Sequence, residues 1–433
     1  MDKRIGIVGG GILGMTLAHR LSQKGCSVTI IEAAKNTGGL ASAWQIDDIT
    51  WDKFYHVILM SDSYTRTILK ELGLDDEINW VETKTGFYSG GRLYSMSNSM
   101  EFLKFPPLDL ISKLRLGFTI FYASKIKNWK KLEKIPVAGW LTKLSGKRTF
   151  EKMWLPLLKS KLGDMYTKTS AAFIWATIQR MYAARRSGLK KEMFGYVNGG
   201  YATILERFDK KLKEEGINIL TEHKVKRIVK SENGKFSVDF INQESKEFDE
   251  VIVTTPSPAI PGICPEIDKD EKSKLAQTQY LGVVCAALLL DKPVSSYYVT
   301  NITDKGFPFT GVIEMTALVD TKQTNGKHLV YLPKYVAADD PVFNESDESI
   351  SKRFVKDLLK MHPHISENNI LFSGIARARQ VFALSTLNYS ESLPKAQSKI
   401  KGLYFINSSF ITNGTLNVNE TIQLAEKAVE QYF

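Results

Sequence analysis

Cysteine and long apolar runs are both scarce in this 433-residue chain. The three cysteines, Cys26, Cys264 and Cys285, have no paired spacing, so the sequence predicts neither a disulfide framework nor a cysteine-based metal site. No stretch approaches the roughly 20 consecutive apolar residues that a membrane-spanning helix needs. The first strand is expected at residue 4 or 5, which leaves no room for a signal or transit peptide. These absences predict a cytoplasmic protein, either soluble or peripheral at the inner face of the membrane.

Acidic residues are nearly absent between Lys104 and Lys161, where 14 Lys or Arg stand against three acids. This excess equals the net charge of the whole chain, +11, so the remainder is neutral. Apolar residues at 110, 114, 117/118 and 121 recur at helical spacing, which indicates amphipathic helices. Three interpretations stay open: a solvated basic face, a contact with anionic lipid headgroups, and a nucleic-acid surface. No nucleic-acid-binding module is recognisable, so no nucleic-acid partner is expected. A basic channel for an acidic substrate is compatible with both the solvated basic face and the contact with lipid headgroups.

A glycine-rich turn near the N-terminus carries the most specific signal. An apolar run over residues 5–8 leads into a G-x-G-x-x-G pattern, then a helix expected to end before Gly25, then a second apolar run that delivers Glu32. This context predicts dinucleotide binding, with free N–H groups of the helix N-terminus facing a pyrophosphate and Glu32 facing an adenosine ribose. The expected cofactor contacts in the turn are Gly9, Gly11, Ile12, Leu13 and Gly14. No second pattern of this kind follows, so a separate NAD(P)H domain is not expected.

The residues after Glu32 include a glycine pair, Gly38-Gly39. Glu-Ala, four residues and Gly-Gly resemble the second signature of the flavin amine oxidase, protoporphyrinogen oxidase and phytoene desaturase superfamily, which has a glutathione-reductase-like FAD fold. The resemblance implies FAD as the cofactor. It implies contacts from Ala33, Gly38, Gly39, Leu40 and Ala41. Many members carry Arg where this chain has Asn36 and Leu40, so phosphate neutralisation by those arginines is absent or supplied elsewhere.

Two later blocks follow the same resemblance. In relatives the residue matching Val225 holds the adenine through its backbone, and a strand such as 249–256 ends below the pyrophosphate, here at Thr254. Near the C-terminus the usual Gly-Glu or Gly-Asp after the last strand is replaced by Asn407-Ser408. A helix expected to begin near Asn419, with Thr421 in its first turn, would direct its dipole at the flavin, and Asn419 is the expected cap. Asn407, Asn419 and Thr421 are therefore further expected cofactor contacts.

The order of these blocks predicts an α/β protein with a Rossmann-type, discontinuous FAD-binding domain. That domain comprises residues 1–60, 195–256 and 398–433. The remainder forms a substrate domain of a mixed sheet plus a helical insertion. Residues 61–194 supply its basic, mainly helical part, and residues 257–397 supply its strand-rich part, with strands expected at 281–290, 311–319 and 328–332.

Candidate catalytic residues are less well defined. Tyr55 and His56 follow the glycine pair where relatives bring a loop to the flavin, which makes Tyr55 a substrate contact and His56 an acid/base or a structural histidine. Glu314, an acid among apolar strand residues, is a second catalytic candidate or a salt-bridged residue. Arg377 is expected to bind an anionic substrate group or to be a surface cation, the latter being favoured. No metal site is expected, because the closely spaced histidines His362 and His364 have no third ligand nearby.

These features predict an FAD-dependent oxidoreductase that dehydrogenates a bulky, partly apolar small molecule by hydride transfer to flavin N5. Its electrons would pass to oxygen, a quinone or another acceptor. Two alternatives belong to other classes: a non-redox flavin enzyme of the sugar-nucleotide mutase type, and a non-catalytic lipid or isoprenoid carrier that retains the fold.

Overall fold

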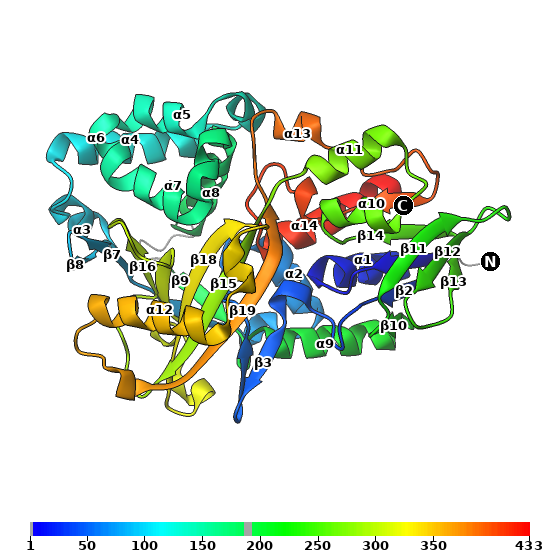
Figure 1. Cartoon of the computed structure of the whole chain (residues 1–433), viewed down its shortest axis with the longest axis horizontal. Coiled ribbons are helices and arrows are strands. Elements are labelled where there is room, and N and C mark those ends of the chain that lie inside the picture. Colours follow the sequence, from blue (N-terminus) through cyan, green and yellow to red (C-terminus); the bar gives the residue numbers. More distant parts are fainter. Residues whose placement is uncertain (1–2, 186–192) are drawn as a thin grey trace.

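The protein consists of two sheet-based lobes that lie side by side (Figure 1). The computed structural model describes residues 3–185 and 193–433. A parallel sheet and its helices form the lobe that holds both termini, and a larger mixed sheet with most of the other helices forms the second lobe. The predicted α/β class is confirmed by this architecture.

The parallel sheet has five strands in the order β10-β2-β1-β14-β20, all paired in parallel. Their bounds are Asn218–Leu220, Ser27–Ile31, Arg4–Val8, Glu250–Val253 and Leu403–Phe405. All five strands come from the three segments expected to form the FAD-binding domain. The strands are short and almost wholly apolar because both faces of the sheet are covered.

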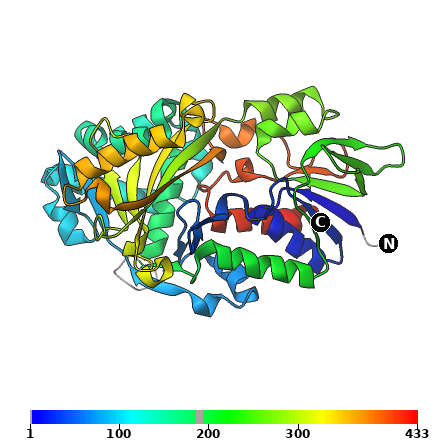
Figure 2. The ribbon, with the colours of Figure 1, turned by 60° about the horizontal axis from the view of Figure 1, so that its bottom comes forward.

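One face of this sheet is covered by three helices, α1 (Ile12–Gln23), α9 (Gly200–Glu214) and α14 (Val418–Tyr432). Helix α1 packs between the other two (Figure 2). The opposite face packs against a three-stranded antiparallel sheet and two short helices. These are β11 (Val225–Lys230), β12 (Phe236–Phe240), β13 (Lys246–Phe248), α10 (Ile260–Ile263) and α11 (Lys269–Gln277).

The second lobe is built on a seven-stranded sheet in the order β19-β15-β18-β17-β16-β7-β8, antiparallel except for the β16–β7 pair. The bounds are Ile370–Ala383, Tyr280–Leu290, His328–Ala337, Gly311–Glu314, Val299–Ile302, Thr85–Ser89 and Arg92–Ser95. One expectation needs correction: the strand expected over 311–319 ends at Glu314, where a 3-10 turn begins. The mainly helical segment 61–194 also supplies β7 and β8.

Helices cover this sheet on both faces. Residues of β15 point alternately to a cluster under α12 (Asp347–Met361) and to the opposite side. That opposite side is covered partly by the helical insertion, which comprises α3 (Ser99–Lys104), α4 (Leu110–Lys125), α5 (Val137–Ser145), α6 (Lys147–Thr149), α7 (Leu155–Leu162) and α8 (Ala171–Arg185). The rest is covered by the hairpin β3 (Ala43–Ile46) and β4 (Ile49–Asp52).

A few short elements join the lobes. Strand β9 (Met193–Tyr196) pairs with β5 (Ile58–Leu59) and β6 (Asn79–Glu82), and helix α2 (Ser63–Glu71) packs against α14. Helix α13 (Tyr389–Ser392) precedes the return to β20. The chain therefore crosses between the lobes several times, and the candidate site lies where those crossings meet.

Candidate functional site

The glycine turn connects β1 to α1 and is tightly packed. Gly9 has φ +113°, and a Cβ added there would lie 2.2 Å from Thr254 Oγ1, which donates a 2.9 Å hydrogen bond to the Val8 carbonyl. A Cβ on Gly14 would lie only 2.0 Å from the Gly9 carbonyl oxygen. The turn and the close packing of α1 on β1 therefore require glycine at both positions. Thr254, expected where its strand ends below the pyrophosphate, lies directly against the turn.

The two glycine segments lie against each other. The Gly38 N–H donates a 2.8 Å hydrogen bond to the Gly10 carbonyl, and Gly11 forms a parallel bridge with Gly38. A Cβ on Gly11 would meet only the Gly39 Cα, at 3.9 Å, so the backbone is otherwise open there. No side chain caps α1 and its first turn carries no acid. The first N–H groups of the helix, those of Ile12, Leu13 and Gly14, are therefore free to receive an anion.

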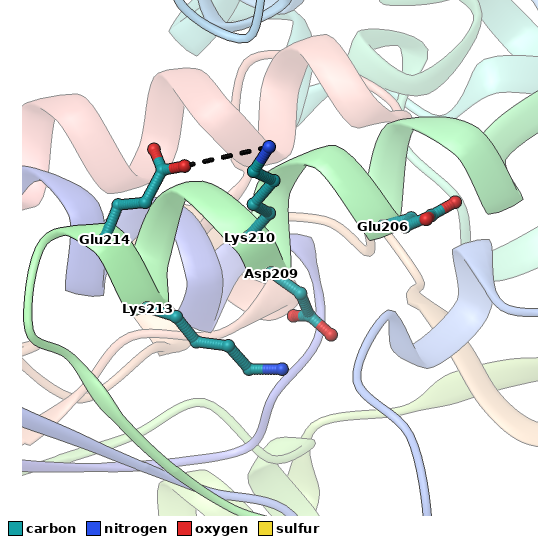
Figure 3. Close-up of a pocket in the computed structure, with 5 residues that line it drawn as sticks. All are labelled: Glu206, Asp209, Lys210, Lys213 and Glu214. Atoms are coloured by element: carbon teal, nitrogen blue, oxygen red, sulfur yellow. Dashed lines mark ion pairs between the residues drawn. The ribbon is translucent and has the colours of Figure 1, made fainter.

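Helix α9 holds the second glycine segment in place. Asp209 accepts a 2.8 Å hydrogen bond from Thr37 Oγ1, and Leu205 packs so closely on Gly38 that a Cβ there would lie 2.5 Å from its Cδ1. Asp209 also lines an open surface depression along α9, where Lys210 and Glu214 form an ion pair of 4.0 Å (Figure 3). This depression is formed by α9 alone. It is separate from the two glycine segments, Gly9–Gly14 and Gly38–Gly39, here called the glycine cradle, so we assign it no ligand.

Glu32 and the segment before Val225 meet at the end of β2. Glu32 accepts hydrogen bonds from Gly10 N–H (2.7 Å) and Ala34 N–H (2.8 Å). Its backbone carbonyl accepts from His223 N–H at 2.9 Å, which places the start of β11 beside it. Ala33 and Ala34 are exposed next to this carboxylate. The two blocks that the resemblance linked to the adenosine end of FAD therefore adjoin each other.

The turn after the glycine pair continues as a short 3-10 helix, Gly39–Ala41. Ala41 is buried and its N–H bonds to the Gly38 carbonyl, while Leu40 is half-buried. Both residues lie beside the cradle. Unlike the arginine of many relatives, Leu40 supplies no positive charge to neutralise a phosphate there.

Asn407 does not present its side chain to the cradle. It is fully buried and accepts hydrogen bonds from Ser409 N–H (3.0 Å) and Ser409 Oγ (2.8 Å), while its own amide donates to Ser257 Oγ at 3.2 Å. Any cofactor contact at this position would have to come from the backbone or from Ser408, which is half-buried.

The cap of α14 lies two residues earlier than expected. Asn417, not Asn419, accepts a 3.0 Å hydrogen bond from Glu420 N–H. Asn419 instead accepts from Tyr64 N–H (2.9 Å) and Thr65 N–H (3.2 Å) at the start of α2. The cap moves because the helix begins at Val418. Thr421 stays in the first turn and donates to the Asn417 carbonyl at 2.8 Å.

His56 lies beside a buried carboxylate. Asp52 is 1% exposed, accepts a 2.8 Å hydrogen bond from Tyr201 N–H at the start of α9, and lies 3.6 Å from His56 Nδ1. Burial raises the pKa of the Asp52 carboxyl. His56 Nδ1 has no hydrogen-bond partner among the described residues, and its ring packs 4.9 Å from the Tyr201 ring. These groups line a cavity of about 10 Å³, roughly the room that one water needs.

Two further tyrosines, Tyr331 and Tyr335, lie beside Tyr55. Its hydroxyl lies 2.9 Å from the Tyr335 hydroxyl, and Tyr331 donates a 2.6 Å hydrogen bond to the Asp52 carbonyl. Tyr331 and Tyr335 lie four residues apart on β18 and so face the same side of the sheet. Burial raises the pKa of all three phenols, which therefore stay protonated and available as neutral hydrogen-bonding groups.

Glu314 and Arg377 lie on the other face of the same sheet. Glu314 pairs across the ladder with Val330, which packs under α12, whereas its neighbour Ile313 pairs with Tyr331. The Glu314 carboxylate accepts from Val294 N–H and Thr316 Oγ1, and burial raises its pKa to about 7.

Arg377 donates to Asp347 Oδ1 (2.5 Å) and to the Glu345 carbonyl (2.7 Å) at the start of α12. The structure brings neither Arg377 nor Glu314 to Tyr55, and both are left out of the proposed site.

A cation that the sequence did not single out lies near the tyrosines, and a second lies close to the first. Lys161, near the end of α7, places its Nζ 5.3 Å from the centre of the Tyr335 ring. Arg180, on α8, donates a 3.1 Å hydrogen bond to Asp62 Oδ2. In the sequence Lys161 is one of 14 bases in a single segment, and only its contact with a distant strand distinguishes it.

A glycine cradle on a parallel sheet, next to a mixed sheet lined by tyrosines, defines a nucleotide-cofactor enzyme of the flavoprotein class. The chain belongs to the flavin containing amine oxidoreductase family, whose match extends over residues 14–429. The resemblance seen in the sequence is therefore confirmed, and the protein is a flavin-dependent oxidoreductase.

Similar proteins differ in their reactions. Zeta-carotene desaturase of Synechocystis is 22% identical over 93% of this chain and 92% of that protein. The fold is similar to that of an oxidoreductase from Methanosarcina mazei, with a TM-score of 0.76 and 18% identity over 99% of this chain and 100% of that chain. It is also similar to reduced UDP-galactopyranose mutase, with a TM-score of 0.75 and 14% identity over 99% and 93%. These structural likenesses show the fold alone.

Proposed function

We propose that the protein binds FAD and dehydrogenates a bulky, partly apolar small molecule. The observation that carries the proposal is the contact between the two glycine segments, Gly9–Gly14 and Gly38–Gly39, at the uncapped start of α1. That cradle fits a pyrophosphate, because backbone N–H groups face an opening that no side chain of the cradle fills. Glu32 would bind the ribose, the start of β11 the adenine, and the start of α14 the flavin ring.

FAD, when bound, supplies a two-electron acceptor for a hydride from a substrate C–H bond, and dioxygen or a quinone would remove those electrons afterwards. The side chains would do the remaining work. Tyr55, Tyr331 and Tyr335 form a wall of protonated phenols that orients the substrate. His56 is the group proposed to hold the released proton, because its Nδ1 has no hydrogen-bond partner and lies 3.6 Å from the Asp52 carboxylate.

The proposal is tested with the purified protein. A yellow preparation that releases FAD on denaturation, and whose flavin absorbance bleaches anaerobically with a substrate, supports it. Turnover that requires prior chemical reduction and consumes no reductant would instead indicate a mutase. A colourless protein that fails to take up FAD would indicate a carrier.

We also propose that the helical insertion docks on an anionic membrane surface. Of the twelve large apolar side chains exposed in the described residues, eight lie on α3 and α4. Six of them form one side of α4, here called the α4 face: Leu110, Ile111, Leu114, Phe118, Phe121 and Tyr122. The helix packs inward through other residues, Leu116, Thr119 and Ala123 among them. Its apolar stripe thus faces solvent, whereas the apolar stripe of a surface helix usually faces the core.

Charge around the α4 face favours a lipid bilayer over other occupants. Exposed lysines lie at the last residue of the helix and beyond it, at positions 125, 127, 130, 131 and 134, and Lys104 precedes its start. Apolar and aromatic side chains flanked by lysines suit the boundary between acyl chains and anionic headgroups. The proposed contact is peripheral. No helix in the described ranges is long and apolar enough to cross a membrane. The anionic leaflet that faces the cytoplasm is the proposed location.

Vesicle co-sedimentation tests this surface. The wild type is expected to sediment with vesicles of mixed phosphatidylserine and phosphatidylcholine at low salt, and not with phosphatidylcholine alone. Phe118→Ser with Phe121→Ser should reduce binding at least tenfold, since each buried Phe contributes about 1.5–3 kcal/mol. Leu371→Ser, at an exposed apolar position on β19, is the matched control and should bind like the wild type. Wild type that stays in solution, or that dimerises through the α4 face instead, would contradict the proposal.

A further inference from the structure

Lys161 reaches from the helical insertion onto the tyrosine side of the seven-stranded sheet. Its Nζ lies 5.3 Å from the ring centre of Tyr335 and 5.8 Å from that of Phe382. The Tyr335 hydroxyl in turn meets the Tyr55 hydroxyl at 2.9 Å. Helix α7 is tied to the sheet here, because Thr310 Oγ1 donates a 2.9 Å hydrogen bond to the Ser160 carbonyl. The ammonium group is thus held next to the proposed substrate wall.

The charge of Lys161 has no counterion in the described ranges, 3–185 and 193–433. No carboxylate there lies within ion-pair distance of its Nζ, and the charged group that acts on it most is another cation, Arg180. Two acids face Arg180: Asp62 accepts its hydrogen bond, and Glu420, at the start of α14, has a pKa that burial raises and the charge of Arg180 partly lowers. Arg180 Nε is itself buried without a partner.

A positive charge on Lys161 beside Arg180 is energetically unfavourable unless a negative charge compensates it. Lys161 is partly buried, so its ammonium loses part of its hydration, and the neighbouring guanidinium repels it. Desolvation and the Arg180 charge together lower the pKa of Lys161 to about 8, so it still carries its charge near neutral pH. The aromatic rings of Tyr335 and Phe382 offset only part of this cost. An uncompensated charge in the wall of a site indicates that a ligand supplies the missing anion.

We propose that Lys161, with Arg180 as the neighbouring positive charge, binds an anionic group of the substrate beside the Tyr55–Tyr335 pair. This inference rests on the proposed function only in taking that space as the substrate site. The substrate would then be amphipathic: an apolar body along the sheet and a carboxylate or phosphate at the end held by Lys161.

Three probes of equal chain length test the assignment: octanoate, octyl phosphate and 1-octanol. Binding is measured by isothermal titration calorimetry at pH 7 on the protein as purified, after its flavin content has been read from its absorbance. The wild type is expected to bind one or both anions at least tenfold more tightly than octanol. Tighter binding of octanoate points to a carboxylate, and tighter binding of octyl phosphate points to a phosphate.

Lys161→Met should abolish the preference for the anion, and Lys161→Arg should retain it. Lys159→Met is the matched control: Lys159 lies on the same helix but is exposed, and its loss should leave the preference unchanged. Equal binding of all three probes by the wild type, or an unchanged preference in Lys161→Met, overturns the assignment. Flavin content reports separately on the proposed function, because loss of FAD binding would appear in the absorbance whatever the probes do.

Discussion

Replacing Gly11 by alanine separates the cofactor role of the glycine cradle from its structural role. Gly11 has φ −73°, which alanine adopts readily, and the added Cβ would meet only the Gly39 Cα at an ordinary 3.9 Å. The apoprotein should therefore fold with a stability within about 1 kcal/mol of the wild type, since a less favourable N-cap is offset by a less flexible unfolded chain. The methyl group would instead fill the open side of the cradle.

A pyrophosphate held away from the first turn of α1 would lose at least two charge-assisted hydrogen bonds. Each contributes about 1.5–3 kcal/mol, so the expected loss is about 3–6 kcal/mol, or a rise in the Kd for FAD of at least about 100-fold. Titration of the apoprotein with FAD, followed by quenching of flavin fluorescence, measures the Kd. Urea unfolding of the same apoprotein measures the stability.

Gly25→Ala provides the opposite control. Gly25 has φ +81° and open space around it, so alanine there should cost about 1–2 kcal/mol of stability through backbone strain alone. Its affinity for FAD should not change. If Gly11→Ala binds FAD as tightly as the wild type, the cradle does not hold the pyrophosphate and the reasoning fails.

Three further predictions concern other parts of the site. Glu32→Ala should weaken FAD binding by about 1–3 kcal/mol because the ribose hydroxyls lose their acceptor, and an unchanged Kd would refute that role. His56→Gln should slow anaerobic bleaching by a substrate about 100-fold without loss of FAD, whereas an unchanged rate would mark His56 as structural. Because the pKa of Lys161 is about 8 when folded and near 10.5 when unfolded, the unfolded state binds more protons between those values. Stability should therefore rise across that pH range, by about 2 kcal/mol after allowance for partial solvent screening, and Lys161→Met should remove the rise.

The cofactor half of the protein was largely predictable from the sequence because its signals are local. The turn at Gly9 and the pair Gly38-Gly39 follow from backbone conformations that few other residues allow. The contact between these two segments then follows from the order of strands in a parallel sheet. Helix ends were less certain. A shift of the start of α14 to Val418 was enough to move the cap from Asn419 to Asn417.

The substrate half was less predictable because its features depend on which face of a sheet or helix is buried. Glu314 follows Ile313, which lies on the same side of the sheet as Tyr331. Because side chains alternate along a strand, Glu314 lies on the opposite side, which α12 covers. Apolar spacing over positions 110–121 indicated an amphipathic helix but did not show that its apolar stripe faces solvent. Strand β19 was missed because Arg377 and Arg379 interrupt its apolar pattern, and the side-chain partners of both arginines lie about 30 residues or more away along the chain.

The absorbance spectrum of the purified protein, followed by identification of the released cofactor, decides whether the glycine cradle holds FAD. The cradle of Gly9–Gly14 and Gly38–Gly39 predicts a yellow protein that releases FAD, and a Gly11→Ala variant that folds normally but purifies with little or none. A colourless wild type that does not take up added FAD, or a Gly11→Ala variant that retains a full complement, would contradict the account.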